Sequence, residues 1–288
     1  MGIKITGTGS YLPERVLTNC EISERVDTTD EWVKKNLGIT TRRIADDNQT
    51  TSDLAYEASI KALEMAKINA SQIDAIIVAT SSPDRISPST ACILQDKLGA
   101  YGCCAFDVNA VCTGFVYGLT VANALLTQPG FNRILLVAAE TYSRITDWDS
   151  RDCVYFGDGS GAVIVEEDGQ GFFDADIKAD GWGKEYFTVK AGGSEFPASH
   201  TTVDNKQHYF DMNGRKIFEF ATKVLPKSIN DILARNELTS NDVSIMLPHQ
   251  PNINILKKVA DETNISIEKV QICLDTIGNT AGASIPIA

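Results

Sequence analysis

The stretch Ala-Phe-Asp-Val-Asn-Ala-Val-Cys-Thr-Gly-Phe, residues 105–115, predicts a buried strand, a turn and the start of a helix around one cysteine, Cys112. Small residues separate the first apolar run from a second run that begins after Gly114. A cysteine at such a junction lies near unpaired N–H groups and the positive end of the helix dipole, which favour the thiolate. Taken alone, Cys112 is better explained as a small buried residue at a tight turn, so the rest of the chain has to decide.

Apolar periodicity on both sides of this stretch predicts alternating helices and strands. Residues 73–80 have the continuous apolar character of a strand buried in a parallel sheet. The predicted strands are residues 3–9, 73–80, 105–108, 133–139 and 160–166, and the main predicted helices are 27–38, 51–68, 90–98, 114–126 and 215–233. This order of elements predicts an α/β fold.

An internal repeat relates two parts of the chain at an offset of about 170 residues. The matched segments are 67–74 with 237–244, 75–80 with 245–249, 90–98 with 253–260, and 105–108 with 273–276. Turn chemistry, periodicity and spacing agree in each pair, and the segments at 245–249 and 273–276 are accordingly predicted to be strands. The chain is therefore expected to consist of two copies of one α/β unit, residues 1–170 and 171–288.

The repeat suggests where the chemistry lies. Cys112 follows the third repeat strand of the first half, Asn279 takes nearly the same place in the second half, and His249 ends the preceding strand. Active sites of open α/β sheets gather at such strand ends, so the three side chains are expected near the pseudo-twofold axis. A histidine after proline is usually structural and an asparagine beside glycine is usually a turn residue, but their joint placement with Cys112 favours catalysis.

Composition and charge exclude several classes of protein. The formal net charge of −12 argues against nucleic acid as a partner. The sequence has no signal-type start and no apolar run of about 18 residues, so a cytoplasmic protein without a membrane segment is expected. The seven cysteines are odd in number and form no Cys-x-x-Cys pair, which predicts neither a disulfide framework nor a metal site.

Three motifs around these residues resemble those of a known family. They are Ala-Val-Cys-Thr-Gly-Phe at 110–115, Leu-Pro-His-Gln-Pro-Asn at 247–252 and Gly-Asn-Thr-Ala-Gly-Ala-Ser at 278–284. With them the chain resembles the thiolase superfamily and, more narrowly, the β-ketoacyl-[acyl carrier protein] synthase III family. The resemblance implies a thiolase-like fold, in which two pseudo-symmetric α/β halves form a layered α-β-α-β-α sandwich.

The resemblance also implies an activity. Members of the family are homodimeric acyltransferases of fatty acid biosynthesis that condense an acyl-CoA primer with malonyl-acyl carrier protein, and no cofactor is implied beyond these thioester substrates. The residue types suit the reaction, because Cys112 can accept the acyl group as an activated nucleophile. His249 Nε2 and Asn279 Nδ2 can donate to the enolate oxygen that forms when the malonyl group loses carbon dioxide.

Further roles follow from the resemblance alone. Trp32 and Arg151 would sandwich the adenine of coenzyme A, and Asn252 would orient groups beside His249. Ser87 lies in a loop that would reach the acyl pocket of the partner subunit. It stands where acetyl-preferring members tend to carry phenylalanine, and the smaller side chain predicts a primer that is branched or longer than acetyl.

Two departures from the family pattern leave alternatives open. Asn36, Glu219 and Asn254 occupy positions where basic residues commonly dock the acidic carrier protein, although nearby lysines and arginines could compensate. Only nine residues follow Asn279, so the C-terminal half is expected to be incomplete. The alternatives are a synthase III-like acyltransferase of secondary metabolism with a different acceptor, and a catalytically silent partner subunit.

Overall fold

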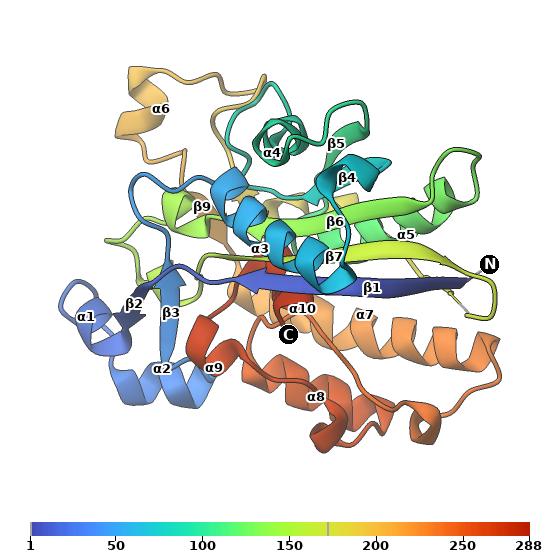
Figure 1. The fold of residues 1–288 in the computed structure, drawn as a ribbon. Helices are drawn as coiled ribbons and strands as arrows, with labels where there is room; N and C mark the ends of the chain where they lie inside the picture. Colours follow the sequence, from blue (N-terminus) through green and yellow to red (C-terminus); the bar gives the residue numbers. More distant parts are fainter. Residues whose placement is uncertain (1, 172) are drawn as a thin grey trace.

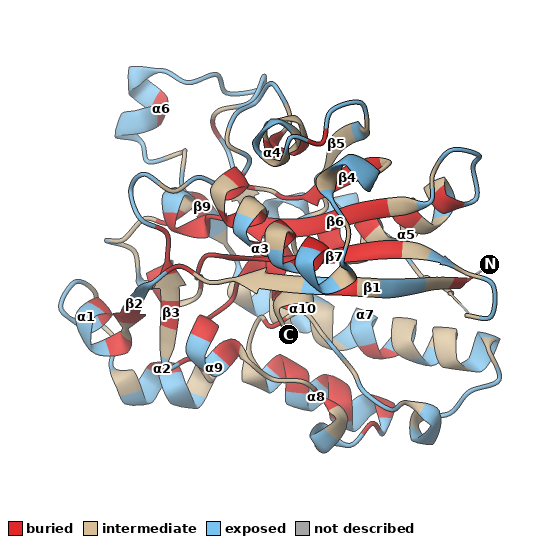
Figure 2. Ribbon diagram, in the orientation of Figure 1, coloured by how far each residue is buried: buried red, intermediate tan, exposed pale blue. Residues whose placement is uncertain are grey.

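The computed structural model describes residues 2–171 and 173–288 (Figure 1). Its main sheet has the strand order β1–β7–β6–β4–β5, in which β4 runs parallel to β5 and β6, and β7 runs antiparallel to β6 and β1. The strands are β1 (Gly2–Tyr11), β4 (Ala75–Ala79), β5 (Cys104–Val108), β6 (Arg133–Glu140) and β7 (Gly159–Asp168). The central strand β6 is buried except at its first residue, as its red ribbon in Figure 2 shows, and β4 is buried along its whole length, because helices cover both faces of the sheet.

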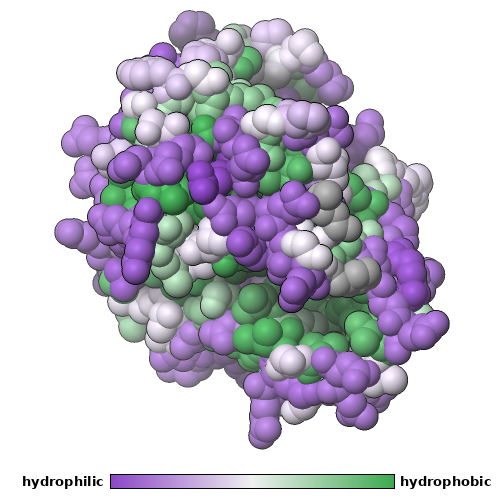
Figure 3. All heavy atoms as spheres, turned by 45° about the vertical axis from the view of Figure 1, so that its right-hand side comes forward, coloured by the Kyte–Doolittle hydropathy of each residue, from purple (hydrophilic) through white to green (hydrophobic). Residues whose placement is uncertain are grey.

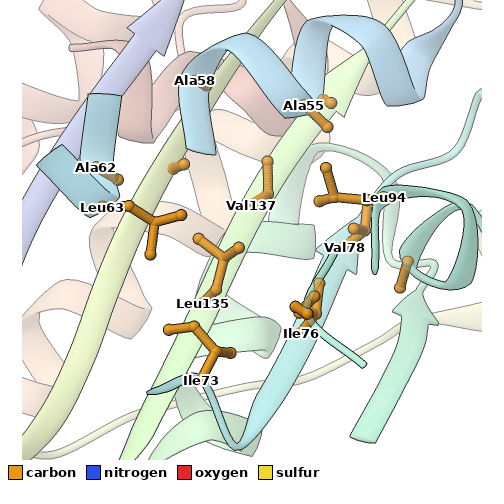
Figure 4. Close-up of a cluster of buried hydrophobic side chains, with 14 of the residues drawn as sticks. Ala55, Ala58, Ala62, Leu63, Ile73, Ile76, Val78, Leu94, Leu135 and Val137 are labelled. Atoms are coloured by element: carbon orange, nitrogen blue, oxygen red, sulfur yellow. The ribbon is translucent and has the colours of Figure 1, made fainter. Parts of the chain in front are cut away.

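Helices α3 (Thr51–Ala66) and α4 (Thr90–Leu98) cover one face of the sheet. Figure 4 shows their packing: Ala55, Ala58 and Leu94 meet the β6 and β4 side chains in one apolar cluster. Small residues at helical spacing along α3 let this helix lie close to the strands. Helices α5 (Gly114–Leu126) and α10 (Ser284–Ile287) take part in the corresponding cluster on the other face. The sheet is therefore the middle layer of an α-β-α sandwich.

The second half of the chain supplies two longer helices, α7 (Gly214–Arg235) and α8 (Ile253–Thr263), which pack on each other below the sheet in Figure 1. Helix α7 continues through Pro226, as the sequence predicts. Its apolar side chains Phe220, Val224 and Leu225 are exposed. Figure 3 shows an apolar band at this level of the molecule, beneath a surface that is mostly hydrophilic.

The remaining elements are short. Two two-stranded sheets pair β2 (Arg15–Thr18) with β3 (Thr41–Ile44) and β8 (Phe187–Val189) with β9 (Phe210–Met212). The short helices are α1 (Asn19–Ser23), α2 (Asp30–Leu37), α6 (His200–Asp204) and α9 (Leu274–Ile277). The β2–β3 pair and helix α2 form the small lobe on which the predicted adenine-binding tryptophan lies.

Three strand predictions need correction. The strand at 105–108 was predicted to be buried, but β5 is a partly exposed edge strand, with only β4 beside it among the described residues. Residues 245–249 form no strand, since Met246 makes just an isolated bridge to Val270. Residues 274–277 are a helical turn, closed by the hydrogen bond from the Gly278 N–H to the Leu274 carbonyl.

The corrections share a physical reason. A strand is stable only where a neighbour completes its ladder of hydrogen bonds, and apolar character alone does not provide that neighbour. The second β layer of the expected sandwich is consequently represented, in the part of the chain that the structure describes, by isolated bridges. The division into units at residues 170 and 171 stays a prediction, and it falls just after β7.

Candidate active site

Two turns with nearly the same backbone conformation lie at the centre of the molecule. The first, η2 (Val111–Thr113), leads into α5, and the second, η8 (Ala281–Ala283), leads into α10. Each begins with a non-glycine residue at positive φ, 49° for Val111 and 45° for Ala281. Such a conformation is unfavourable for L-residues and most so for a β-branched one. The two turns thus share one conformation at the offset of 170 residues that the predicted repeat has.

This correspondence refines the register of the repeat. Cys112 is the counterpart of Gly282, and Asn279 is the counterpart of Asn109, three residues before the cysteine. The two turns pack on each other so closely that a methyl group placed on Gly282 would lie 2.9 Å from the Val111 carbonyl oxygen. Glycine is thus required at the position that faces the turn of Cys112.

Cys112 lies on the first turn and packs against a cluster of aromatic side chains, Tyr142, Phe156 and Phe210. Burial and the nearby negative charge of Glu140 raise the pKa of the thiol to about 12, although a backbone N–H lowers it. The local helix start was predicted to favour the thiolate, but desolvation outweighs it here. The resting side chain is a neutral thiol beside an apolar wall suited to an acyl chain.

His249 is held from the second turn. Its Nδ1 lies 2.7 Å from the Ser284 hydroxyl, which is also 2.8 Å from the Ala281 carbonyl oxygen and accepts a hydrogen bond from the Gln250 N–H. Burial lowers the pKa of the imidazole to about 4, so it is neutral at physiological pH. The single hydroxyl proton of Ser284 donates to the Ala281 carbonyl oxygen in this geometry. Rotation of that hydroxyl toward Nδ1 would place the imidazole proton on Nε2.

Asn279 is buried, with 5% of its surface exposed, where the chain enters the second turn. Its backbone is clamped on both sides, because its N–H donates to the Tyr155 carbonyl and its own carbonyl accepts from the Gly157 N–H. Its Oδ1 accepts a hydrogen bond of 2.9 Å from the Ala281 N–H. Nδ2 has no hydrogen-bond partner among the described residues and can therefore donate to a ligand.

Cys112, His249 and Asn279 thus converge on one pair of turns. The cysteine turn packs on η8, the asparagine leads into η8, and the serine that follows η8 binds the histidine. Two residues near them were not singled out in the sequence, Ser284 and Glu140. Glu140 had a signal, since an acidic residue ends the apolar run 134–139. Ser284 had none apart from its place in the motif 278–284.

The predicted coenzyme A residues are only partly brought together. Trp32 on α2 and Arg151 stack directly, with the guanidinium carbon 4.8 Å from the ring centroid. A planar base between them needs two van der Waals separations, roughly 7 Å, so they must part to admit it. Asn252 caps α8 by accepting a hydrogen bond from the Asn254 N–H. Ser87 is exposed on the loop after β4 and lies outside the two turns.

Three positions of the predicted carrier-docking surface, here called the rim, lack basic residues: Asn36, Glu219 and Asn254. All three bind neighbouring groups. The Asn254 side chain donates to the Asn36 carbonyl oxygen at 2.7 Å and so links α8 to α2. Glu219 pairs with both Arg215 and Lys216, so its single negative charge offsets one of the two positive charges expected to compensate. The charge offered to an acidic carrier is thereby reduced.

Neither a metal cluster nor a membrane helix occurs in the described part of the chain. No group of three His, Cys, Asp or Glu side chains in residues 2–171 and 173–288 is arranged to hold a metal ion. No helix in the same ranges is long and apolar enough to cross a membrane.

Comparisons with known proteins agree across the chain. Residues 106–181 match the family model described as 3-oxoacyl-[acyl-carrier-protein (ACP)] synthase III, and residues 233–288 match the model of its C-terminal part. The beta-ketoacyl-[acyl-carrier-protein] synthase III of Caldanaerobacter subterraneus is 46% identical over 99% of this chain and 87% of that protein. The protein of that name from Syntrophomonas wolfei is 44% identical over 100% of this chain and 87% of that protein.

Solved structures match as well. The 3-oxoacyl-[acyl-carrier-protein] synthase III of Aquifex aeolicus superposes with a TM-score of 0.88 at 37% identity, covering 99% of this chain and 89% of that chain. The corresponding enzyme of Pseudomonas aeruginosa gives a TM-score of 0.90 at 33% identity, covering 100% and 87%.

Proposed function

The chain belongs to the 3-oxoacyl-[acyl-carrier-protein] synthase III family, and on that premise we propose that it condenses an acyl-CoA primer with malonyl-acyl carrier protein through an acyl-Cys112 intermediate. This decarboxylative Claisen condensation initiates fatty acid synthesis. The thiolase-like α/β fold predicted from the sequence is confirmed by the match to the solved structures. The observation that carries the mechanism is the convergence of a thiol and two neutral donors on turns η2 and η8.

In the first half-reaction the Cys112 sulfur forms a bond to the acyl carbonyl carbon, and the carbon–sulfur bond to coenzyme A breaks. The thiol proton leaves with the coenzyme A thiolate, so the step is balanced without a separate base. Cys112 lies directly before α5, whose free N–H groups are suited to the oxyanion of the tetrahedral intermediate. The neighbouring aromatic cluster receives the acyl chain.

In the second half-reaction the malonyl carbon–carboxylate bond breaks, and its electron pair moves onto the thioester as an enolate. His249 Nε2–H and Asn279 Nδ2–H donate to the enolate oxygen. A neutral imidazole suits this role, because it donates without taking up the charge, and the lowered pKa of His249 keeps it neutral. Carbon dioxide leaves, the enolate carbon attacks the acyl carbonyl carbon, and the Cys112 sulfur leaves as a thiolate that takes up a proton from solvent.

A mass-spectrometric experiment tests the proposal and separates it from its alternatives. The protein is incubated with acyl-CoA and then with malonyl-carrier protein or malonyl-CoA, while acyl-Cys112 is followed by intact mass. We expect acylation followed by malonyl-dependent turnover. Failure of acylation supports a silent partner subunit, and acylation without turnover supports a transferase with another acceptor. Cys112→Ala should abolish acylation, whereas His249→Ala should spare acylation and impair decarboxylation.

A second function, acyl transfer to a different acceptor, is favoured by the rim. The uncharged Asn36–Asn254 pair and the negative charge of Glu219 reduce the positive charge where an acidic carrier would dock. Comparison of carrier-bound and CoA-bound malonyl donors at low salt distinguishes the two functions. A strong preference for the carrier-bound donor would exclude the second one.

We also infer a cytoplasmic homodimer that joins through strand β5. The strand is the open edge of the sheet, and Ile86, on the loop after β4, is 90% exposed, which suits a loop that reaches into a partner.

Seven free cysteines support the reducing compartment. The adjacent Ser87 supports a primer that is branched or longer than acetyl. Analytical ultracentrifugation tests the dimer, and a clear preference for acetyl-CoA over butyryl-CoA in acylation would contradict the primer assignment.

A further inference from the structure

Glu140 is a buried carboxylate that the mechanism above does not use. It ends the central strand β6, and none of its surface is exposed. No lysine, arginine or histidine in the described residues forms an ion pair with it. A buried charge without a counterion is costly, so the protein must stabilise it by hydrogen bonds or keep it protonated.

Five donors from residues 80–82 satisfy this carboxylate, and the longest contact is from the Thr80 hydroxyl, 3.4 Å from Oε2. The Ser81 N–H lies 3.2 Å from each oxygen and the Ser82 N–H 3.1 Å from Oε2. The hydroxyls donate as well, Ser81 Oγ at 3.0 Å to Oε1 and Ser82 Oγ at 2.5 Å to Oε2. These residues follow strand β4, so Glu140 fixes the turn at the end of the strand next to the one that leads to Cys112.

The opposite side of the carboxylate meets the second catalytic turn. A methyl group on Gly282 would lie 3.3 Å from Glu140 Oε1 and 2.9 Å from the Val111 carbonyl oxygen. The glycine is thus wedged between the carboxylate and the residue that precedes Cys112. Through this contact Glu140 touches both the turn at the end of β4 and the turn that carries Asn279 and Ser284.

We propose that Glu140 is a positioning residue of the catalytic centre, which holds the Ser81–Ser82 turn and the Gly282 turn around Cys112. The proposal rests on the nucleophilic role assigned to Cys112 above. It explains why a strand that is otherwise apolar ends in a carboxylate with no cation beside it.

The titratable groups near Glu140 are sensitive to whether its carboxyl group is ionised. The negative charge of Glu140 raises the pKa of the Cys112 thiol on η2 and that of Tyr142, whose hydroxyl lies 2.7 Å from the Ser81 hydroxyl that also binds Glu140. The turns at Ser81–Ser82 and Gly282 contribute no titratable side chain. Burial raises the pKa of Glu140 to about 7 in spite of its five donors. Glu140 and Cys112 are therefore expected to titrate as a coupled pair.

Two conservative variants separate charge from geometry. Glu140→Gln removes the negative charge and can keep the side chain bound to the Ser81–Ser82 turn. Its amide NH₂, at the Oε1 position, can donate to the Ser81 hydroxyl, which also contacts Tyr142. Glu140→Asp keeps the charge but shortens the side chain by one methylene, so it cannot hold both turns. Glu166→Gln is the matched control, a carboxylate on β7 near the other end of the sheet, roughly 20 Å away along the strands.

The charge is tested by alkylation of Cys112 with iodoacetamide between pH 6 and 10, followed by mass. Like charges in a buried site commonly shift a pKa by about one unit, so Glu140→Gln should react about tenfold faster than wild type at pH 8. Its profile should follow a single ionisation, while the wild-type profile is broader. Glu166→Gln should match wild type. A folded Glu140→Gln variant with the wild-type rate and profile would overturn the electrostatic role.

The geometry is tested by condensation turnover with acyl-CoA and malonyl-carrier protein. Glu140→Asp should lower kcat about tenfold or more, because small displacements of catalytic turns are expensive, while alkylation keeps its wild-type pH profile. A kcat within twofold of wild type would overturn the positioning role. Failure of wild type to form acyl-Cys112 would refute the proposed function instead, so the two outcomes are distinguishable.

Discussion

Gly282→Ala is the most direct test of how the two turns cooperate. The new methyl group would lie 2.9 Å from the Val111 carbonyl oxygen and 3.3 Å from Glu140 Oε1. A carbon–oxygen contact settles at about 3.5 Å, so the first contact is short by roughly 0.6 Å. Its partner is backbone, which cannot rotate away as a flexible side chain could. The η2 and η8 turns must therefore separate by several tenths of an ångström.

The cost follows from this displacement. Overpacking of a tight interior contact destabilises a protein by about 1–3 kcal/mol, which for a chain of this size corresponds to a fall in Tm of roughly 2–10 °C. Misplacement of catalytic groups by 1 Å costs about a hundredfold in rate, so a smaller shift should lower turnover about ten- to thirtyfold. Because both turns move, acylation and condensation should both slow, in contrast to His249→Ala.

The assay combines thermal unfolding, the rate of acyl-Cys112 formation and malonyl-dependent turnover. Gly169→Ala is the matched control, since a methyl group there meets nothing within 4 Å and should leave all three unchanged. If Gly282→Ala unfolds at the wild-type temperature and acylates at the wild-type rate, the close approach of the two turns does not constrain the catalytic centre and the reasoning fails.

Four further outcomes are expected. Ser284→Ala removes the partner of His249 Nδ1 and should lower condensation about tenfold or more while sparing acylation, measured as separate half-reactions. The pKa of His249 in the folded protein, about 4, lies below its unfolded value. The neutral imidazole therefore contributes up to about 3 kcal/mol to the free energy of unfolding above pH 6.5, and this contribution is lost as the pH falls toward 4. Urea unfolding should show this fall in the free energy of unfolding for wild type and not for His249→Ala. Trp32→Ala should raise KM for acyl-CoA about tenfold and leave acylation by acyl-pantetheine, which has no adenine, unchanged. Glu219→Gln frees two cations and should lower KM for malonyl-carrier protein at low salt but not at high salt, with no change for malonyl-CoA as donor.

Elements with strong local signals were predictable from the sequence. Helix α4 was predicted at residues 90–98 and is observed there, because Ser89 caps its first turn and Gly99 ends it in the left-handed conformation. Strand β4 was predicted from its unbroken apolar run, and it is buried along its whole length. The repeat and its motifs indicated Cys112, His249 and Asn279, because turn chemistry and spacing are written in consecutive residues.

Strand pairing and protonation states, which depend on residues that are distant in the sequence but close in space, were not predictable from the sequence. The apolar run at 105–108 does not reveal that β5 is an edge strand, and residues 245–249 do not reveal that only Val270 pairs with them. Protonation states belong to the same class, since the thiol of Cys112 looked activated at a helix start and is instead neutral in its buried setting. Burial and through-space charge decide such properties, and a linear pattern carries neither.

The sequence by itself determined the family, the elements with strong local signals, and the prediction of Cys112 as the nucleophile within residues 105–115. Only the tertiary structure decided that Gly282 is the counterpart of that nucleophile and that Ser284 holds His249. It also showed that the Glu140 carboxylate lies against the same turn. The physical reason is that these three contacts join residues from separate elements, whose approach is fixed by packing of the whole sheet and its helices.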